Sequence, residues 1–487
     1  MTPDESPTLR EICYPGRCKI IWKKFPITVE PIIFVIFFLY SLTDAVGTNV
    51  LISKTCTIVY NFSSSDCVGK LEPDVEGLVQ SYTTQITMIK LILESVVSGV
   101  ISMFVGFWSD VNGRKPFIVI PTAGFALYYI SWFIFINLPY VSPMWVLLPS
   151  LCSSLAGGVA SIFICVFCYV TDITNENNRA FRMAAVYSTL TLGIISGYLT
   201  SSFVYNTYGH SAIIIIYSIA TGASFLALLY ATILLPESKQ PVEGVSASFF
   251  NFVNLKETLV TVFMPRPQKK TLLTLMEAFI IVISTTIING EMAFKYYALR
   301  KSFSWVLEDY NLYSGVLAGV SVIATTLGSY ISCSILHVHD LYIAMFVALT
   351  STISCLLLAL SRTAVEFYLF SIVGCLGSLL NPMLKTQISR TVEPSNLGKY
   401  FAFVSTLEAF VPLFTSPMYR SVYNAVLNIQ PLYYLFLSSG LWAVISVLVM
   451  TVLLIKSFFA RDYDQLLING DPDEIDHTTS DVQTPDE

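Results

Sequence analysis

Long apolar runs recur along almost the whole chain, and they limit the fold more than any other feature. Each run holds about 20 or more residues, the length that an α-helix needs to cross the hydrocarbon core of a bilayer. Backbone groups inside lipid must be satisfied within the segment, so helices are expected. The chain is 54% hydrophobic and 12% charged, whereas soluble domains carry about 25% charged residues. These observations predict an all-α, polytopic membrane protein.

The runs predict twelve transmembrane helices in two six-helix pseudo-repeat halves. Their ranges are 27–52, 78–108, 117–137, 143–171, 181–203, 211–235, 272–295, 311–335, 341–360, 364–388, 399–422 and 430–457. The predicted parts of the chain are an N-tail (1–26), an N-terminal half (27–235), a central loop (236–270), a C-terminal half (271–458) and an acidic tail (459–487). Polar elbows reading "TDITNENNRAFRMA" and "SRTVEPSNLGKYFA" follow the fourth and tenth ranges, as a repeat would place them.

The basic residues predict the orientation of the chain. If the N-tail is cytoplasmic, the inner segments hold 19 of the 27 lysines and arginines, in keeping with the positive-inside rule. Both termini, the central loop and the acidic tail are therefore expected in the cytoplasm. The plasma membrane is the favoured location of the protein. An endolysosomal membrane stays open, because "DYDQLL" at Asp462–Leu467 matches an acidic dileucine pattern.

The loop after the first span carries three residues typical of an extracellular segment. Asn61 begins an Asn-Phe-Ser sequence, the acceptor pattern for N-glycosylation. Cys56 and Cys67 bracket it, and two nearby cysteines outside the cell favour a disulfide. Spacing alone leaves free thiols as the alternative.

A compact charged hinge, "GFWSDVNGRK", separates the second and third ranges. Gly106 allows close helix approach, and Gly113 permits a tight turn. Asp110 suits the positive end of a helix, and Arg114 offers a planar fork for a carboxylate or carbonyls. With Lys115, these residues form a gating motif that would hold two halves together in one state and release them in another. A plain basic inner loop is the simpler alternative.

The hinge resembles the signature of the major facilitator superfamily, Gly-x-x-x-Asp-x-x-Gly-Arg-Lys/Arg. A closer likeness is to the proton-coupled folate transporter family, solute carrier family 46, through "ITVEPIIF", "FWSDVNGRKPFIV", "YVTDITNENNRAFRMA" and "NPMLKTQIS". The resemblance implies that Asp110 stabilises the outward-facing state by meeting the start of the eleventh helix near Gly398. It implies a role for Asp172 at the end of the fourth helix. Lys385 stands where the folate transporter has an arginine that handles substrate or protons.

Two family positions differ in this chain. The glutamate of the fifth helix falls on Tyr187, and the histidine of the seventh falls near Thr286. A tyrosine does not take the proton role of a carboxylate near neutral pH. The differences argue against folate as the substrate and against proton coupling by the same residues.

The remaining charges inside the spans are expected to face a cavity or a partner. Asp44 and Glu408 are lone acids and therefore candidates for proton or substrate binding. Lys90 and Glu94 have i, i+4 spacing and are expected to neutralise each other. Glu30, Glu277 and Glu291 are expected near helix ends, in the membrane interface.

Together these features predict a transporter of a small organic solute that works by alternating access. Lys385 favours an anionic solute, and Asp44, Asp172 or Glu408 could couple its movement to protons. The alternative is a non-transporting receptor on the same fold. An enzyme is not expected, because the four histidines are scattered and no nucleotide loop or zinc spacing occurs. No cofactor, metal or nucleic-acid partner is predicted; the expected partners are the solute, protons and the lipid bilayer.

Overall fold

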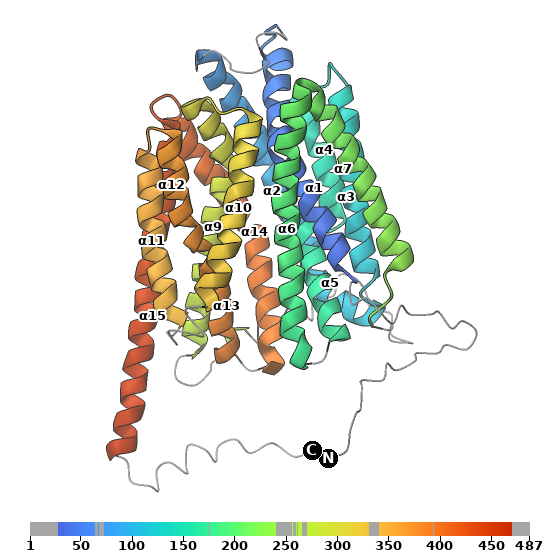
Figure 1. Ribbon diagram of the computed structural model, residues 1–487. Coiled ribbons are helices and arrows are strands. Elements are labelled where there is room, and N and C mark those ends of the chain that lie inside the picture. The colour runs from blue at the N-terminus through green and yellow to red at the C-terminus, as the bar shows by residue number, and fades with distance from the viewer. Residues whose placement is uncertain are drawn as a thin grey trace, which may run out of the picture.

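The protein forms a bundle of long helices (Figure 1). This computed structural model describes residues 28–63, 67, 73–174, 176–239, 256, 260, 262–264, 270–330, 340–392 and 394–469. These residues contain helices and turns but no strand. Most of the central loop beyond 239, the N-tail and most of the acidic tail lie outside the described residues.

The N-terminal group of helices precedes residue 235. It comprises α1 (Glu30–Lys54), α2 (Pro73–Asn112), α3 (Pro116–Asn137), α4 (Leu147–Leu155), α5 (Gly158–Ile173), α6 (Glu176–Tyr208) and α7 (Ala212–Leu229). A π-helical turn, Thr55–Val59, extends α1, and another, Tyr230–Leu234, extends α7. A 3-10 turn, Pro143–Val146, leads into α4.

The C-terminal group follows residue 270. It comprises α9 (Lys270–Phe303), α10 (Leu307–Tyr330), α11 (Asp340–Leu360), α12 (Ala364–Gly374), α13 (Leu380–Thr391), α14 (Pro394–Val426) and α15 (Leu435–Asn469). The 3-10 segment Cys375–Leu379 joins α12 to α13. In Figure 1, α15 extends beyond the rest of the bundle.

A helix lies on each range predicted from the apolar runs, and ten helical segments of the described chain are long and apolar enough to cross a membrane. The helices α6 and α14 are not among the ten. Both are 33 residues long, so length does not exclude them. The chain is therefore an all-helical membrane protein with multiple spans.

The two groups meet along two helix pairs. α6 packs against α10, and α2 packs against α14; Figure 1 shows α6 beside α10 in the middle of the bundle. Within the N-terminal group, α1 packs closely on α6. Gly193 and Gly197 make this approach possible, because an added Cβ at Gly193 would lie 2.7 Å from the backbone oxygen of Phe34, and one at Gly197 would collide with that of Phe38.

The fourth predicted range is interrupted near its middle. α4 ends at Leu155 and α5 begins at Gly158. Gly157 and Gly158 adopt φ values of +97° and +58°, a region that favours glycine because it has no Cβ. A Cβ at Gly158 would lie 2.6 Å from the hydroxyl of Ser98 in α2. The break therefore packs directly against α2.

A disulfide links Cys56 to Cys67, with their Cα atoms 5.8 Å apart. It lies between the end of the α1 segment and the start of α2, so it marks one end of the bundle, called here the disulfide end. Asn61 lies between the two cysteines in the chain, is exposed and has a φ of 55°. Asparagine is one of the few residues other than glycine that adopt this conformation readily.

Candidate functional site

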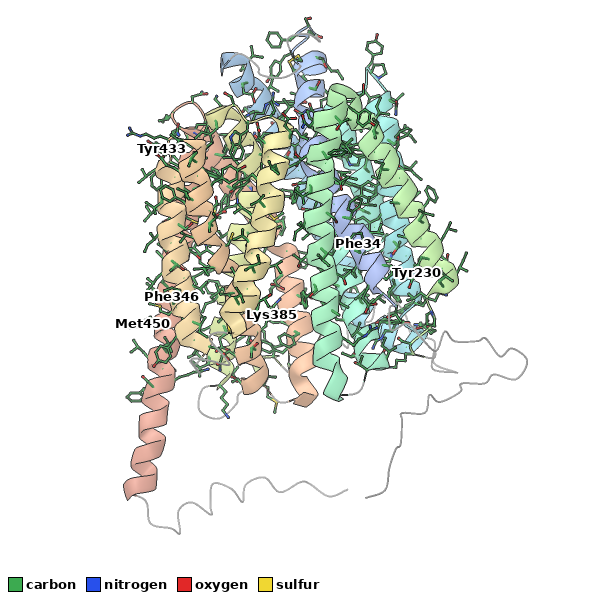
Figure 2. The ribbon with its side chains drawn as sticks, in the orientation of Figure 1. Phe34, Tyr230, Phe346, Lys385, Tyr433 and Met450 are labelled. Atoms are coloured by element: carbon green, nitrogen blue, oxygen red, sulfur yellow. A yellow bond between two sulfur atoms is a disulfide. The ribbon has the colours of Figure 1, made fainter. Side chains whose placement is uncertain are left out.

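An ion pair between two helices lies inside the C-terminal group. The ammonium of Lys385 in α13 is 3.4 Å from the carboxylate of Glu408 in α14. Thr285 of α9 donates a hydrogen bond of 3.3 Å to the same carboxylate. The side chains of Lys385 and Glu408 are 36% and 20% exposed, so the pair remains reachable; Figure 2 labels Lys385. The expectation that Glu408 is a lone acid is wrong, because tertiary packing brings Lys385 to it.

A second ion pair in this group involves Glu291, which the sequence placed near a helix end. Glu291 binds Lys295 at 3.3 Å, one turn further along α9, with side chains 15% and 23% exposed. The thiol of Cys355 in α11 lies 3.6 Å from Glu291. The placement of Glu291 near a helix end is wrong, because α9 continues twelve residues further, to Phe303; its place in the membrane interface stays a prediction. Glu277 also differs from expectation, since it is fully buried and pairs with Lys456 of α15 at 3.5 Å.

The N-terminal group holds a separate polar cluster, called here the Asp44 cluster: Tyr40, Asp44, Lys90, Glu94 and Tyr198. The Tyr198 hydroxyl donates a hydrogen bond of 3.0 Å to Asp44 across the contact between α6 and α1. Lys90 and Glu94 form the i, i+4 pair expected from the sequence, 3.7 Å apart. Tyr40, one turn before Asp44, is 44% exposed.

Near the disulfide end, buried and partly buried polar side chains tie the two groups together in what we call the closure cluster: Asn49, Glu76, Gln80, Arg300 and Tyr423. Arg300 of α9 lies 2.9 Å from Glu76 of α2 and donates a hydrogen bond of 3.0 Å to Asn49 of α1. Gln80 donates to Glu76 and accepts from the Tyr423 hydroxyl of α14, both at 2.7 Å.

Other contacts between the groups lie at the same end. Asn311 of α10 donates to the Ser201 hydroxyl of α6 at 2.8 Å, and Ser202 donates to the backbone oxygen of Glu308 at 3.0 Å. The Thr87 and Tyr297 hydroxyls, on α2 and α9, are 2.9 Å apart. Because Glu76 and Arg300 fall outside the apolar ranges 78–108 and 272–295, the sequence alone assigned them to loops.

The charged hinge lies at the opposite end of α2, and its described contacts stay within the N-terminal group. The Arg114 guanidinium lies 3.0 Å from Asp172 of α5 and donates to Ser109 at 2.7 Å. The Lys115 ammonium donates to the backbone oxygen of Thr232 at 2.8 Å. Gly113 has a φ of +95°, as the predicted turn requires. Gly398 lies in α14, but the surroundings of Gly106, Asp110 and Gly398 are outside what the structure describes, so the predicted contact of Asp110 near Gly398 stays a prediction.

Glu237 is a hinge residue that sequence reasoning missed. Its carboxylate accepts the backbone N–H groups of Arg114 at 2.7 Å and of Lys115 at 3.1 Å. These are the donors before the first turn of α3, where a negative charge is stabilised by the helix dipole. The sequence did contain one signal for this role: an acidic residue follows Pro236, directly after the sixth predicted range ends at 235.

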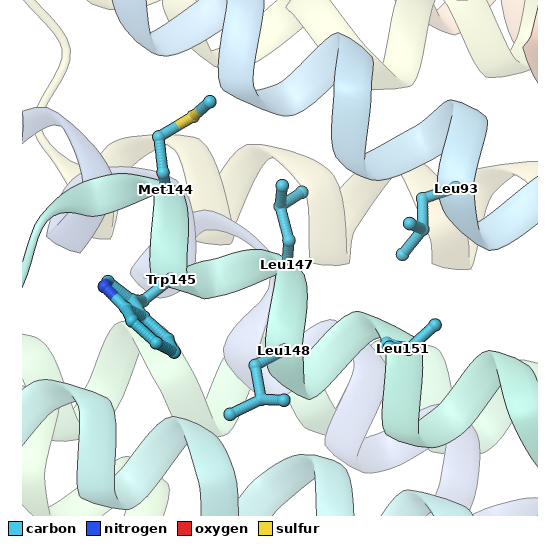
Figure 3. A pocket seen from close by; sticks show the side chains of 6 residues that line it. All are labelled: Leu93, Met144, Trp145, Leu147, Leu148 and Leu151. Carbon is cyan, nitrogen blue, oxygen red and sulfur yellow. The ribbon is translucent and has the colours of Figure 1, made fainter.

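One apolar groove lies on the side of the bundle (Figure 3). It has a volume of about 300 Å³ and is lined by Leu93 of α2 and by Met144, Trp145, Leu147, Leu148 and Leu151. Trp145 and Leu148 are 59% and 50% exposed, as expected for side chains that face lipid. A groove with this apolar lining does not fit a charged solute. The ion pairs inside the bundle are therefore the better candidates for a binding site.

The fold and these contacts define the class of the protein as an all-helical membrane protein with multiple spans and partly exposed charge pairs among its helices. The Major Facilitator Superfamily model matches residues 33–417, and the chain belongs to this superfamily. Its curated relatives are membrane transporters, which agrees with the resemblance to solute carrier family 46.

Three relatives show this likeness. The chain is 25% identical to the probable peptidoglycan muropeptide transporter SLC46 of Drosophila melanogaster, covering 83% of this chain and 81% of that protein. It is 27% identical to the lysosomal proton-coupled steroid conjugate and bile acid symporter SLC46A3 of Gallus gallus, covering 82% and 87%. It is 22% identical to the proton-coupled folate transporter of Rattus norvegicus, covering 86% and 91%.

A solved structure shows the same fold. The human organic anion transporter MFSD10 superimposes with a TM-score of 0.58 at 16% sequence identity, covering 86% of this chain and 99% of that one.

Proposed function

We propose that the protein carries a small organic anion across a membrane by alternating access between an N-terminal and a C-terminal half. In this proposal α6 and α14 also cross the membrane, which gives twelve spans, and the halves are residues 27–235 and 271–458. The polar content of α6 and α14 fits helices that face both a partner half and a solute path. The closure cluster fits a gate that is shut at the disulfide end.

The observation that carries the proposal is the partly exposed pair of Lys385 and Glu408. A charge in a bilayer is costly unless it is paired or hydrated, and Glu408 is the partner of Lys385 in this state. A substrate carboxylate that binds Lys385 must take the place of Glu408. The displaced carboxylate would then be left unpaired in a medium of low dielectric.

Protonation of Glu408 removes this obstacle. A neutral Glu408 releases Lys385 and needs no cation, so one proton and one substrate carboxylate enter the site together without adding net charge. This competition supplies proton coupling although Tyr187 and Thr286 replace the family's glutamate and histidine. Asp172 has a different role in this scheme, because Arg114 holds it in the hinge.

The names of the relatives support the substrate class. Folate, bile acids and muropeptides are all compounds with carboxylates, and two of the three relatives are named as proton-coupled. We propose that the disulfide end faces the exterior or a lysosomal lumen and that both termini are cytoplasmic. Asn61 would then be available for glycosylation, and the positive-inside pattern would hold. The plasma membrane is our first choice and an endolysosomal membrane the second.

The test is uptake of labelled folate, glycocholate and a muramyl dipeptide into cells that express the full chain, at outside pH 5.5 and 7.4. We expect faster uptake of at least one anion at pH 5.5. Lys385→Ala should reduce that uptake by about tenfold or more, the effect of losing roughly 1.4 kcal/mol of binding. Glu408→Gln should retain exchange of the anion but lose its dependence on pH.

Arg362→Gln is the matched control, because it removes an exposed cation that precedes α12, whereas Lys385 lies in α13. Its uptake should equal that of the unchanged protein at equal surface expression. Wild-type uptake by Lys385→Ala would refute the assigned site. Lack of any flux with full surface expression would instead favour the receptor alternative.

A further inference from the structure

The Asp44 cluster contains two carboxylates but one lysine. Lys90 contacts Glu94 at 3.7 Å, and its charge also acts on Asp44. Among the described groups that act on Asp44, Lys90 is the cation and Tyr198 the hydrogen-bond donor. With both carboxylates ionised, the cluster has one negative charge that its own lysine does not balance.

The neighbouring elements add hydroxyl groups. Tyr40 lies on α1 itself, and Tyr128 of α3 lies near Lys90. Tyr297 of α9 and Tyr310 of α10, in the C-terminal group, lie close enough to Asp44 to interact with its charge. Phenols are neutral hydrogen-bonding groups at physiological pH. These hydroxyl groups therefore do not neutralise the carboxylate.

Asp44 retains capacity for a ligand. A carboxylate has about four acceptor positions, and the Tyr198 hydroxyl occupies one of them. Asp44 is partly exposed, and Tyr40 on the same face of α1 is 44% exposed. Because α1 also packs near α10, this face lies toward the junction of the two groups, where a solute would pass.

We propose that Asp44 binds an ammonium group of the solute, so that the substrate is an organic anion that also carries an amine. This inference rests on the proposed transport function and narrows its substrate class. The ammonium supplies the positive charge that the cluster lacks, and Tyr40 contributes a neighbouring hydroxyl. Lys385 receives the carboxylate of the same class of solute at the second site.

The two sites lie at different depths. Thr285 contacts Glu408, and Tyr297, which lies within electrostatic reach of Asp44, follows twelve residues later on the same helix, α9. Twelve helical residues correspond to about 18 Å at 1.5 Å per residue. A solute that engages both sites at once must be longer than a single amino acid, with its amine and its carboxylate well separated.

The test measures binding of two labelled compounds to the purified full-length protein at pH 7.4. One is a muramyl tripeptide that ends in lysine, and the other is the same tripeptide with the lysine amine acetylated. They match in length and carboxylates and differ by one positive charge. We expect the free amine to bind about tenfold or more tightly, and Asp44→Asn to abolish this preference while the acetylated compound binds unchanged.

Tyr198→Phe is the matched control. It removes the hydroxyl that contacts Asp44 but leaves the carboxylate, so the preference for the free amine should persist. Equal loss in Tyr198→Phe and Asp44→Asn would make Asp44 a structural partner of Tyr198 and overturn the inference. Equal affinity of the wild type for both compounds would overturn it while leaving the proposed anion transport intact.

Two further outcomes separate the alternatives. If the acetylated compound binds more tightly at pH 5.5 than at pH 7.4, and if Asp44→Asn removes this difference, Asp44 is a proton site. The proposal that Asp44 binds an ammonium group of the solute would then fail. If neither tripeptide binds but a carboxylate without an amine, such as glycocholate, is transported, the substrate class inferred here is wrong and the proposed function stands.

Discussion

Arg114 and Asp172 form an ion pair of 3.0 Å that joins the hinge after α2 to the end of α5. The side chain of Arg114 is 6% exposed, so water does not readily replace its partner. Ser238 donates to the same carboxylate at 3.2 Å, and Glu237 holds the neighbouring backbone. The hinge is thus tied to α5 and to the segment Glu237–Ser238, which follows the N-terminal group.

The first prediction concerns this ion pair. Arg114→Ala and Asp172→Asn should each lower transport by about tenfold, because each leaves a mostly buried charged or polar group without its partner, at a cost of about 1–3 kcal/mol. The double variant should lose little more than either single one, since both remove the same interaction. Uptake of the best substrate at equal surface expression measures this. Multiplicative losses would show that the residues act separately.

The second prediction concerns the closure cluster. Glu76→Gln should weaken the contact with Arg300 and favour opening of the disulfide end. In a Thr48→Cys background, a membrane-impermeant thiol reagent added outside should react about tenfold faster when Glu76→Gln is present. Arg362→Gln, which removes an exposed charge elsewhere, should leave the rate unchanged. An unchanged rate with Glu76→Gln would mean that the cluster does not control access.

The third prediction concerns the contact between α1 and α6. Gly197→Ala should destabilise the protein by about 1–3 kcal/mol, the range for overpacked cores, because its Cβ would collide with the Phe38 backbone. Gly222→Ala in α7 is the matched control, since nothing lies within 4 Å of an added Cβ there. Thermal unfolding of both variants in detergent checks this. Equal melting temperatures would contradict the close packing.

The fourth prediction concerns the orientation of the disulfide end. Glycosidase treatment should shift the electrophoretic mobility of the unchanged protein but not of Asn61→Gln. Ser63→Ala should behave like Asn61→Gln, because it removes the hydroxyl residue of the acceptor pattern. Ser64→Ala should retain the shift. A chain that carries no glycan in any of these forms would remove the support that Asn61 gives to the proposed orientation.

The positions of the helices could be predicted from sequence because lipid requires long apolar runs, and each run lies on a helix. The ends of the helices could not be predicted from sequence, because polar residues such as Glu76 and Arg300 continue the helix where one group contacts the other. The pair of Lys90 and Glu94 follows from helical spacing alone. Lys385 and Glu408 lie on different helices, so their contact depends on tertiary packing that no local pattern encodes.

The interruption between α4 and α5 has a mechanical consequence. An unbroken helix transmits a tilt at one end to its whole length, whereas two segments joined at Gly157 and Gly158 can tilt by different amounts. The segment that carries Asp172 can therefore follow the hinge while α4 keeps its packing on α2 and α3. A rearrangement at one face of the membrane need not disturb the lipid contacts of Trp145 near the other.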